Sequence, residues 1–243
     1  MISFGEGLKI CVIGSSGGLG SAFVKNLEKR ESVESVIALS RNKSDMCSSK
    51  IEEICIDIES EESIIRASKQ IKQKKIDIII VATGILQNSF LRAEKRISQI
   101  EPDAINQIFR VNAVGPILVM KHFLPLMNPD RRSVFAFLSA KVGSITDNKL
   151  GGWASYRSSK AALNMLIKTA SIEIKRSLPN CIVASLHPGT VDTNLSKPYQ
   201  RGVAKDKLFS PDYAVENLLN VIDNLTIADT GCFFSWNGEK LDY

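Results

Sequence analysis

A tyrosine and a lysine, Tyr156 and Lys160, stand four residues apart in the segment Ala-Ser-Tyr-Arg-Ser-Ser-Lys. If this segment is helical, the two side chains lie on one face, and the ammonium group can sit beside the phenol. A phenol with a pKa near ~10 is a poor general base at neutral pH, but a neighbouring cation stabilises the phenolate and lowers that pKa. The pair therefore indicates acid–base chemistry at Tyr156, although the spacing alone is common.

A glycine-rich segment directly follows the apolar run Leu8–Ile13: Gly14 to Gly20 read Gly-Ser-Ser-Gly-Gly-Leu-Gly. Glycine permits positive φ angles and a close approach of the backbone to a ligand or a neighbouring helix. A helix that starts here presents free N–H groups and its positive dipole end to a phosphate. After the first strand of a βαβ unit, the segment favours a dinucleotide-binding loop; a plain tight turn is the alternative.

The next apolar run ends at Ser40-Arg41, about where an NAD site usually places a carboxylate for the ribose 2′-hydroxyl. Ser40 removes the repulsion that a carboxylate would exert on a 2′-phosphate, and Arg41 offers a bidentate cation for it, with Lys43 close by. The pattern favours NADP(H), while NAD(H) stays possible because Arg41 could be an exposed loop cation. Asp57 could accept a hydrogen bond from the adenine amino group, or it could form an Asx turn.

Short apolar runs alternate with longer amphipathic segments along the whole chain. We expect strands at Leu8–Ile13, Val36–Ser40, Glu53–Ile56, Ile76–Ala82, Ser133–Ser139, Cys181–His187 and Cys232–Ser235. We expect helices at Gly18–Lys29, Glu61–Lys72, Pro102–Asn112 running on towards Met127, Ala154–Ser177 and Pro211–Asn224. Continuous apolar strands separated by helices are typical of a parallel sheet reached by right-handed crossovers. The sequence predicts one domain over residues 1–243, a doubly wound, Rossmann-type α/β fold with about seven parallel strands and helices on both faces.

Two long polar segments, residues 143–153 and 194–209, follow expected strands at their carboxyl ends. Open α/β sheets bind ligands on that side. We therefore expect these segments to line a substrate pocket, although simple insertions are the alternative. Candidate pocket residues are Leu86, Val142, Trp153 and Leu195.

The composition excludes several classes of protein. The net charge is +5, but the basic residues are scattered and no aromatic–basic array accompanies them, so we expect no nucleic-acid partner. The five cysteines include no Cys-x-x-Cys pair, and with only two histidines the chain predicts neither a disulfide framework nor a metal site. No run approaches the ~18 apolar residues of a membrane span. We expect a cytoplasmic protein with no membrane partner.

The combined pattern resembles the short-chain dehydrogenase/reductase family over essentially the whole chain. The resemblance is carried by Gly14–Gly20, Val111-Asn112-Ala113, Tyr156–Lys160 and the run from His187 to Thr193. The insert at residues 143–153 and the tail from Gly231 to Gly238 look like the C-factor/Sniffer-type carbonyl reductase branch.

This resemblance implies a role for each matching residue. It implies that Tyr156 is the acid/base, that Lys160 holds the nicotinamide ribose and tunes the phenol, and that Asn112 anchors a water of the proton relay. Thr190 and Thr193 would contact the carboxamide or the phosphates. A helix-kink residue is the alternative for Asn112, and a structural role is the alternative for His187.

Two departures from the family pattern weaken the expected catalysis. Where relatives usually carry a serine that hydrogen-bonds the substrate carbonyl, this chain has Ala140, with Ser139 one residue earlier. Adjacent strand residues point to opposite faces, so Ser139 can replace the missing hydroxyl only after a backbone shift; Ser144 is the other nearby hydroxyl. The turn after the fourth strand reads Val81-Ala82-Thr83-Gly84 and lacks the usual side-chain amides. Loss of one oxyanion-type donor costs ~10²–10³ in rate.

We therefore predict an NADP-preferring oxidoreductase that transfers a hydride between its cofactor and a small carbonyl or alcohol substrate. The alternative is a cofactor-binding signalling or regulatory protein of the same fold with weakened catalysis. The family resemblance suggests a homodimer or homotetramer. The predicted catalytic residues are Tyr156, Lys160, Asn112 and Ser139. The predicted cofactor residues are Gly14, Ser15, Ser16, Gly18, Leu19, Gly20, Ser40, Arg41, Asp57, Ile58, Ala82, Thr83, Gly84, Asn112, Tyr156, Lys160, Pro188, Gly189, Thr190, Val191 and Thr193.

Overall fold

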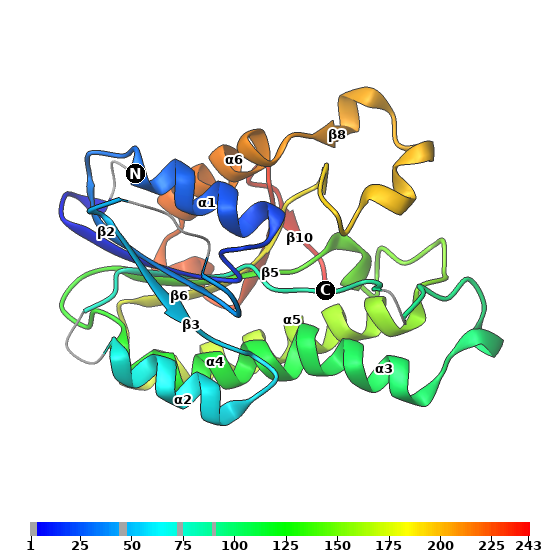
Figure 1. The fold of residues 1–243 in the computed structure, drawn as a ribbon, viewed down its shortest axis with the longest axis horizontal. Coiled ribbons are helices and arrows are strands. Elements are labelled where there is room, and N and C mark those ends of the chain that lie inside the picture. Colours follow the sequence, from blue (N-terminus) through cyan, green and yellow to red (C-terminus); the bar gives the residue numbers. More distant parts are fainter. Residues whose placement is uncertain (1–3, 44–47, 72–74, 89–90) are drawn as a thin grey trace.

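A twisted, mostly parallel sheet forms the centre of the molecule (Figure 1). The computed structural model describes residues 4–43, 48–71, 75–88 and 91–243. The eight-stranded sheet has the order β10-β9-β6-β5-β4-β1-β2-β3, and only β10 runs antiparallel to its neighbour. The strands are β1 (Leu8–Ile13), β2 (Val33–Ser40), β3 (Ile51–Cys55), β4 (Ile78–Val81), β5 (Ser133–Leu138), β6 (Cys181–His187), β9 (Cys232–Ser235) and β10 (Lys240–Leu241). The Rossmann-type fold predicted from the sequence is confirmed, and β10 is the one strand that this sheet adds to the seven predicted.

Helices cover both faces of the sheet (Figure 1). On one face lie α1 (Gly18–Glu28) and α6 (Pro211–Asn224). On the other lie α2 (Glu61–Gln70), α3 (Pro102–Phe109), α4 (Gly115–Phe123) and α5 (Ala154–Ser177). The last residue of the predicted helix Glu61–Lys72 lies outside the described residues. The strand order reverses between β1 and β4, so the carboxyl ends of these strands flank the crevice in which such sheets bind ligands.

The apolar strands are buried on both faces because successive side chains alternate between two cores. In β4, Ile78 and Ile80 join the cluster under α1 and α6, whereas Ile79 and Val81 join the cluster under α2, α4 and α5. All four residues are buried. This two-sided burial fixes the sheet as the rigid base from which the carboxyl-end loops extend.

The helix expected to continue from Pro102 towards Met127 is interrupted. Residues Arg110–Val114 form a π-helical turn between α3 and α4. Pro116 lies in the first turn of α4 and has no N–H to give to the carbonyl of Asn112, which weakens regular α-helical bonding at this point. The interruption places the buried Asn112 within a widened turn that packs against α5.

Candidate active site

The glycine loop is shaped by contacts that leave no room for a side chain. Gly14 has a φ of +87°, and a Cβ built there would lie 2.9 Å from Cγ2 of Thr83. A Cβ on Gly20 would lie 2.0 Å from the carbonyl oxygen of Gly14, and one on Gly18 would lie 2.7 Å from Cγ2 of Thr193. Gly17, the N-cap residue of α1, has no side chain that could accept a hydrogen bond from the N–H groups of the first helical turn. The loop fits a bound pyrophosphate group.

Many of the predicted cofactor residues line one cleft at the carboxyl ends of β1, β2, β3 and β4. These residues are Gly14, Ser16, Ser40, Arg41, Asp57, Ile58, Ala82, Thr83 and Gly84. Glu59, Asn88 and Gln107 also line it and were not predicted. No local motif marks them, since they reach the cleft from loops and from α3 only after folding.

The Ser40-Arg41 pair lies at the cofactor cleft. The hydroxyl of Ser40 donates to the carbonyl of Asn42 at 2.5 Å, and Arg41 is exposed. Asp57 forms the Asx turn that the sequence left open: Oδ1 accepts from the N–H of Glu59 at 3.0 Å. Asp57 also lines the cleft, so its role in the Asx turn does not conflict with the predicted hydrogen bond to the adenine amino group.

Tyr156 and Lys160 lie together and are buried near the N-terminus of α5. Lys160 Nζ lies 5.9 Å from the centroid of the Tyr156 ring and donates to the carbonyl of Leu138 at 2.9 Å. Burial lowers the pKa of Lys160 to about 8, and burial raises the pKa of Tyr156 to about 12. Sequence reasoning expected Lys160 to lower the tyrosine pKa, but desolvation outweighs that effect in the protein alone. Tyr156 is therefore protonated at neutral pH and can act as a proton donor.

Asn112 ties the loop after β4 to α5. Its Oδ1 accepts from the N–H of Ile85 at 2.8 Å, and its Nδ2 donates to the carbonyl of Ile85 at 2.8 Å and to the hydroxyl of Ser159 at 3.1 Å. Asn112 thus supplies bracing to the turn that lacks the usual amides. Its place in the π-helical turn fits the helix-kink interpretation, and its role in a proton relay stays a prediction.

Ser139 and Ala140 follow β5, which ends at Leu138, one residue before the end of the expected strand. Their side chains still point to different sides, as expected for adjacent residues in an extended segment. The hydroxyl of Ser139 donates to Oδ1 of Asn164 at 2.7 Å, on the buried face of α5. Ala140 instead packs with Leu86 and Tyr156. A methyl group, and no hydroxyl, therefore stands at this position beside the phenol, while the predicted catalytic hydroxyl of Ser139 is engaged elsewhere. Ser144 is also buried, and its hydroxyl accepts from the N–H of Asp147 at 3.1 Å.

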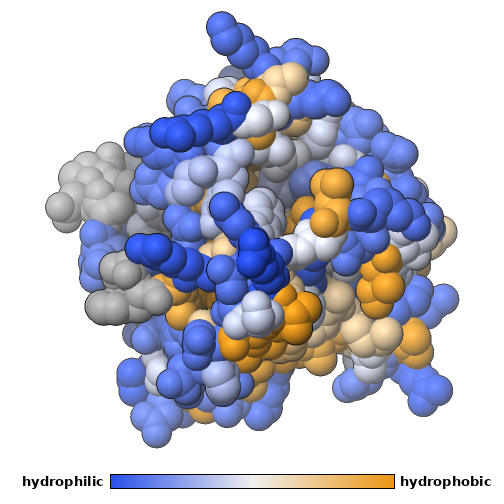
Figure 2. Space-filling view, turned by 90° about the vertical axis from the view of Figure 1, so that its right-hand side faces the viewer, coloured by the Kyte–Doolittle hydropathy of each residue, from blue (hydrophilic) through white to orange (hydrophobic). Residues whose placement is uncertain are grey.

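An apolar cluster packs around the side chain of Tyr156. Leu86, Ala140 and Tyr156 form a cluster against which Ala93, Val142, Trp153, Leu195 and Tyr199 pack. The four residues proposed from sequence as pocket residues, Leu86, Val142, Trp153 and Leu195, belong to this cluster or pack against it, and their role in lining a substrate pocket stays a prediction. Ala93 and Tyr199 were missed, although Tyr199 lies in a loop that the sequence marked. Figure 2 shows the face onto which these loops open: groups of apolar side chains interrupt a largely hydrophilic surface.

The segment after β6 holds the predicted residues Pro188 to Thr193, which are not among the residues that line the cofactor cleft. Thr193 alone is shown beside the glycine loop, where its Cγ2 would lie 2.7 Å from a Cβ on Gly18, and the cofactor contacts of this segment stay a prediction. Gly189 has a φ of +78°, and the rings of Phe209 and Trp236 leave no space for a side chain on it. Thr190 and Val191 form β7 (Thr190–Val191), which pairs with β8 (Leu208–Phe209). Burial lowers the pKa of His187 to about 4, so this imidazole is neutral at physiological pH. Its neutrality is consistent with a structural role at the end of β6.

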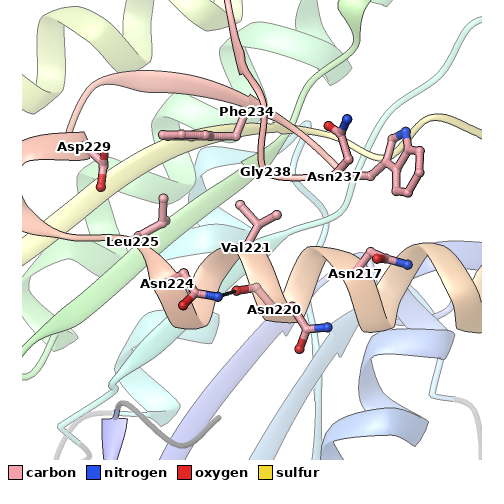
Figure 3. A pocket seen from close by; sticks show the side chains of 10 residues that line it. Asn217, Asn220, Val221, Asn224, Leu225, Asp229, Phe234, Asn237 and Gly238 are labelled. Carbon is pink, nitrogen blue, oxygen red and sulfur yellow. Dashed lines mark hydrogen bonds between the residues drawn. The ribbon is translucent and has the colours of Figure 1, made fainter.

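A second pocket lies between α6 and β9, apart from the predicted catalytic residues (Figure 3). Asparagine side chains rim it, three of them on α6, and Val221, Leu225 and Phe234 line its apolar part. Asn224 Nδ2 donates to the carbonyl of Asn220 at 2.8 Å, so part of this amide rim is bonded within the helix. The pocket contains none of the predicted cofactor residues, and the candidate active site is the cleft at the carboxyl ends of β1 to β4, which Lys160 adjoins at Gly84.

Comparison with known proteins assigns the family. The model of the short chain dehydrogenase family matches residues 9–204, and the chain belongs to this family. It is accordingly a NAD(P)-dependent oxidoreductase. An uncharacterized oxidoreductase of Schizosaccharomyces pombe is 29% identical, with 96% of each chain covered. C-signal of Myxococcus xanthus is 33% identical over 56% of this chain and 76% of its own.

Solved structures show the same fold. An NADPH-bound carbonyl reductase from chicken fatty liver is similar with a TM-score of 0.85 and 23% identity, covering 98% of this chain and 95% of that one. Carbonyl reductase Sniffer of D. melanogaster is similar with a TM-score of 0.86 and 22% identity, covering 98% and 100%. Within the described part of the chain, no helix has the length and apolar character needed to cross a membrane. Among the same residues, no three His, Cys, Asp or Glu side chains gather where they could hold a metal ion.

Proposed function

We propose that the protein is an NADP-preferring oxidoreductase acting on small, largely apolar carbonyl compounds or the corresponding alcohols. The observation that carries this proposal is the position of Tyr156 and Lys160. Both are buried, Lys160 Nζ is the nearest neighbour that a side chain on Gly84 of the cofactor cleft would meet, and Tyr156 packs in the apolar cluster. An acid–base pair between the proposed cofactor cleft and an apolar cluster suits hydride transfer to a neutral carbonyl.

The cleft residues fit the nicotinamide cofactor that the family uses. The loop from Gly14 to Gly20 would hold its pyrophosphate, and Ser40 and Arg41 would hold a 2′-phosphate. Lys160 would hold the nicotinamide ribose. The bound nicotinamide would supply or accept the hydride. The NADP preference is supported by the lack of a carboxylate at Ser40 and by the NADPH in the similar chicken enzyme.

The chain's own residues would handle the proton. Tyr156 holds a proton on its hydroxyl at neutral pH, since the ordinary pKa of a phenol is already ~10 and burial raises that of Tyr156 to about 12. In the reductive direction that hydroxyl would donate to the substrate oxygen, and the ammonium of Lys160 would stabilise the phenolate left behind. Asn112 would anchor the water through which the proton is replaced. The methyl group of Ala140 adds no donor, so the substrate oxygen depends on Tyr156.

A cofactor-binding signalling protein is the weaker alternative. The missing serine at position 140 was its main support in the sequence. Against it, Lys160 Nζ and Asn112 Oδ1 are the neighbours that a side chain on Gly84 of the cofactor cleft would meet, and Tyr156 accompanies Lys160 on α5, which is more than a cofactor sensor needs. A single domain, a cytoplasmic location and a homodimeric or homotetrameric assembly stay predictions of the sequence.

Turnover of a panel of neutral aldehydes and ketones with NADPH would test the function. We expect NADPH oxidation that depends on the carbonyl compound and that falls by orders of magnitude in Tyr156→Phe, because the ring remains but the proton donor is lost. NADPH binding, measured by fluorescence titration, should survive in this variant. A wild-type protein that binds NADPH but reduces no carbonyl would refute the enzymatic proposal and favour the signalling role.

A further inference from the structure

Loops from three parts of the chain meet beside Tyr156, and Tyr199 connects them. Tyr199 lies in the 3-10 turn Lys197–Gly202, within the segment between β7 and β8. Its ring centroid is 4.7 Å from that of Trp153, with an interplanar angle of 62°. Its hydroxyl donates a hydrogen bond to Oε1 of Gln87, in the loop after β4. One side chain therefore joins the loops that follow β4, β5 and β7.

Trp153 is a fixed partner for this ring. It has a φ of 52°, which places a bulky residue in the left-handed region, and Gly151 and Gly152 before it also have positive φ angles. Hydrogen bonds to other segments stabilise this conformation, and in one of them the N–H of Trp153 donates to the carbonyl of Glu94 at 2.6 Å. The Arg157 guanidinium also donates to the carbonyl of Gly152 at 2.9 Å. A residue kept in an unfavourable conformation by several contacts at an active site is a candidate for a specific role.

The indole is directed at the catalytic tyrosine. Trp153 and Tyr156 make an edge-to-face contact with ring centroids 6.4 Å apart and an interplanar angle of 81°. Tyr199 packs on Trp153 and belongs to the same apolar cluster as Leu86 and Ala140. Tyr199 thus stands one aromatic ring, that of Trp153, away from Tyr156.

We propose that Tyr199 is a specificity-determining residue that limits the size of the apolar substituent which a carbonyl substrate can carry. This inference rests on the proposed function, because it concerns the substrate of the same site. The ring of Tyr199 supplies the wall, and its edge-to-face contact with Trp153 and its hydrogen bond to Gln87 keep the wall in place. A larger substituent, such as a fused bicyclic group, would have to displace Tyr199 from both partners.

The test compares two aryl ketones with the same reacting group, acetophenone and its naphthyl analogue. In wild type, kcat/KM should favour acetophenone. In Tyr199→Ala, the ratio of naphthyl to phenyl kcat/KM should rise by about tenfold or more, within the range that pocket size alone can give. Tyr199→Phe keeps the wall and should leave the ratio within about threefold of wild type. Tyr213→Ala is the matched control, since Tyr213 contacts Phe209 and Trp236 and not the cluster beside Tyr156.

The outcomes separate the inference from the function on which it rests. If wild type reduces acetophenone but Tyr199→Ala leaves the ratio unchanged, the inference is wrong and the proposed function stands. If wild type reduces neither ketone, calorimetric titration of the NADPH-saturated proteins decides. If Tyr199→Ala binds the naphthyl ketone more tightly than wild type does, while binding of acetophenone is unchanged, the size limit holds even though no reaction occurs. If the two proteins bind the naphthyl ketone equally, or neither binds it, the inference is wrong. An equal change of ratio in Tyr213→Ala also overturns it.

Discussion

Restoring a hydroxyl at position 140 should accelerate the enzyme, whereas removing the neighbouring hydroxyl at position 139 should not slow the chemistry. Ala140 is extended, with φ −147° and ψ 140°, and packs with Tyr156. A serine Oγ there would lie near the phenol and could add a second donor to the substrate oxygen. A well-aligned donor of this kind is worth ~10²–10³ in rate. Tyr156 already supplies one donor and the new hydroxyl loses rotamer freedom, so we expect a gain in kcat/KM of about tenfold, or ~1.4 kcal/mol.

The neighbouring position provides the control. Ser139 Oγ is bonded to Asn164 Oδ1 at 2.7 Å, and both side chains are buried. Ser139→Ala leaves that acceptor without its partner, which should cost about 1–3 kcal/mol of folding stability. Turnover per folded molecule should change little. Both variants would be assayed with reactive ketones at saturating NADPH, beside urea unfolding. Two results would refute the conclusion that position 140, and not position 139, faces the substrate oxygen. One is a Ser139→Ala variant with reduced turnover and normal stability, and the other is an Ala140→Ser variant with unchanged kcat/KM in an enzyme whose wild type is already fast.

Two further predictions concern charged groups. Arg41→Ala should weaken NADPH binding by about tenfold or more and leave NADH binding nearly unchanged, because only NADPH carries the 2′-phosphate. Fluorescence titrations with both cofactors would measure this, and equal losses of affinity would contradict the role of Arg41 at the 2′-phosphate. Burial lowers the pKa of Lys160 from 10.5 to about 8, so between these pH values the unfolded chain binds more protons than the folded protein, and folding stability rises with pH. Relative to Lys160→Met, the wild type should gain on the order of 3 kcal/mol of unfolding free energy between pH 7 and 10.5. If denaturant unfolding gives parallel pH curves for the two proteins, Lys160 is not desolvated.

The sequence predicted most of the fold because the signals for it are local. Apolar runs of strand length such as Leu8–Ile13 and Cys181–His187 match β1 and β6 residue for residue, and the helix Ala154–Ser177 matches α5. The interruption at Arg110–Val114 was missed, since Pro116 in a first helical turn is compatible with a regular helix. The short strand β10 was missed because two residues carry no periodic pattern.

The site was predicted where one segment carries the chemistry and missed where several segments combine. Tyr156 and Lys160 share one helix, so their proximity followed from their spacing. The direction in which the pKa of Tyr156 shifts could not be predicted from the spacing, because desolvation depends on the loops that bury the phenol. Tyr199 and Gln87 are 112 residues apart, and no spacing rule indicates their contact. The sequence thus indicates the reaction more readily than it indicates the shape of the substrate pocket.

Unsatisfied hydroxyls at the glycine loop give a test of cofactor binding that does not depend on turnover. Ser15 Oγ and Thr83 Oγ1 are buried without a hydrogen-bond partner among the described residues, and Thr83 is the nearest side chain to Gly14. Such groups cost about 1–3 kcal/mol each, and a ligand that satisfies them recovers part of this cost. Ser15→Ala and Thr83→Val should therefore keep or raise the stability of the free protein while reducing the rise in melting temperature that NADPH produces. If both variants lose stability without NADPH and keep the full NADPH-induced shift, the hydroxyls serve the fold and not the cofactor.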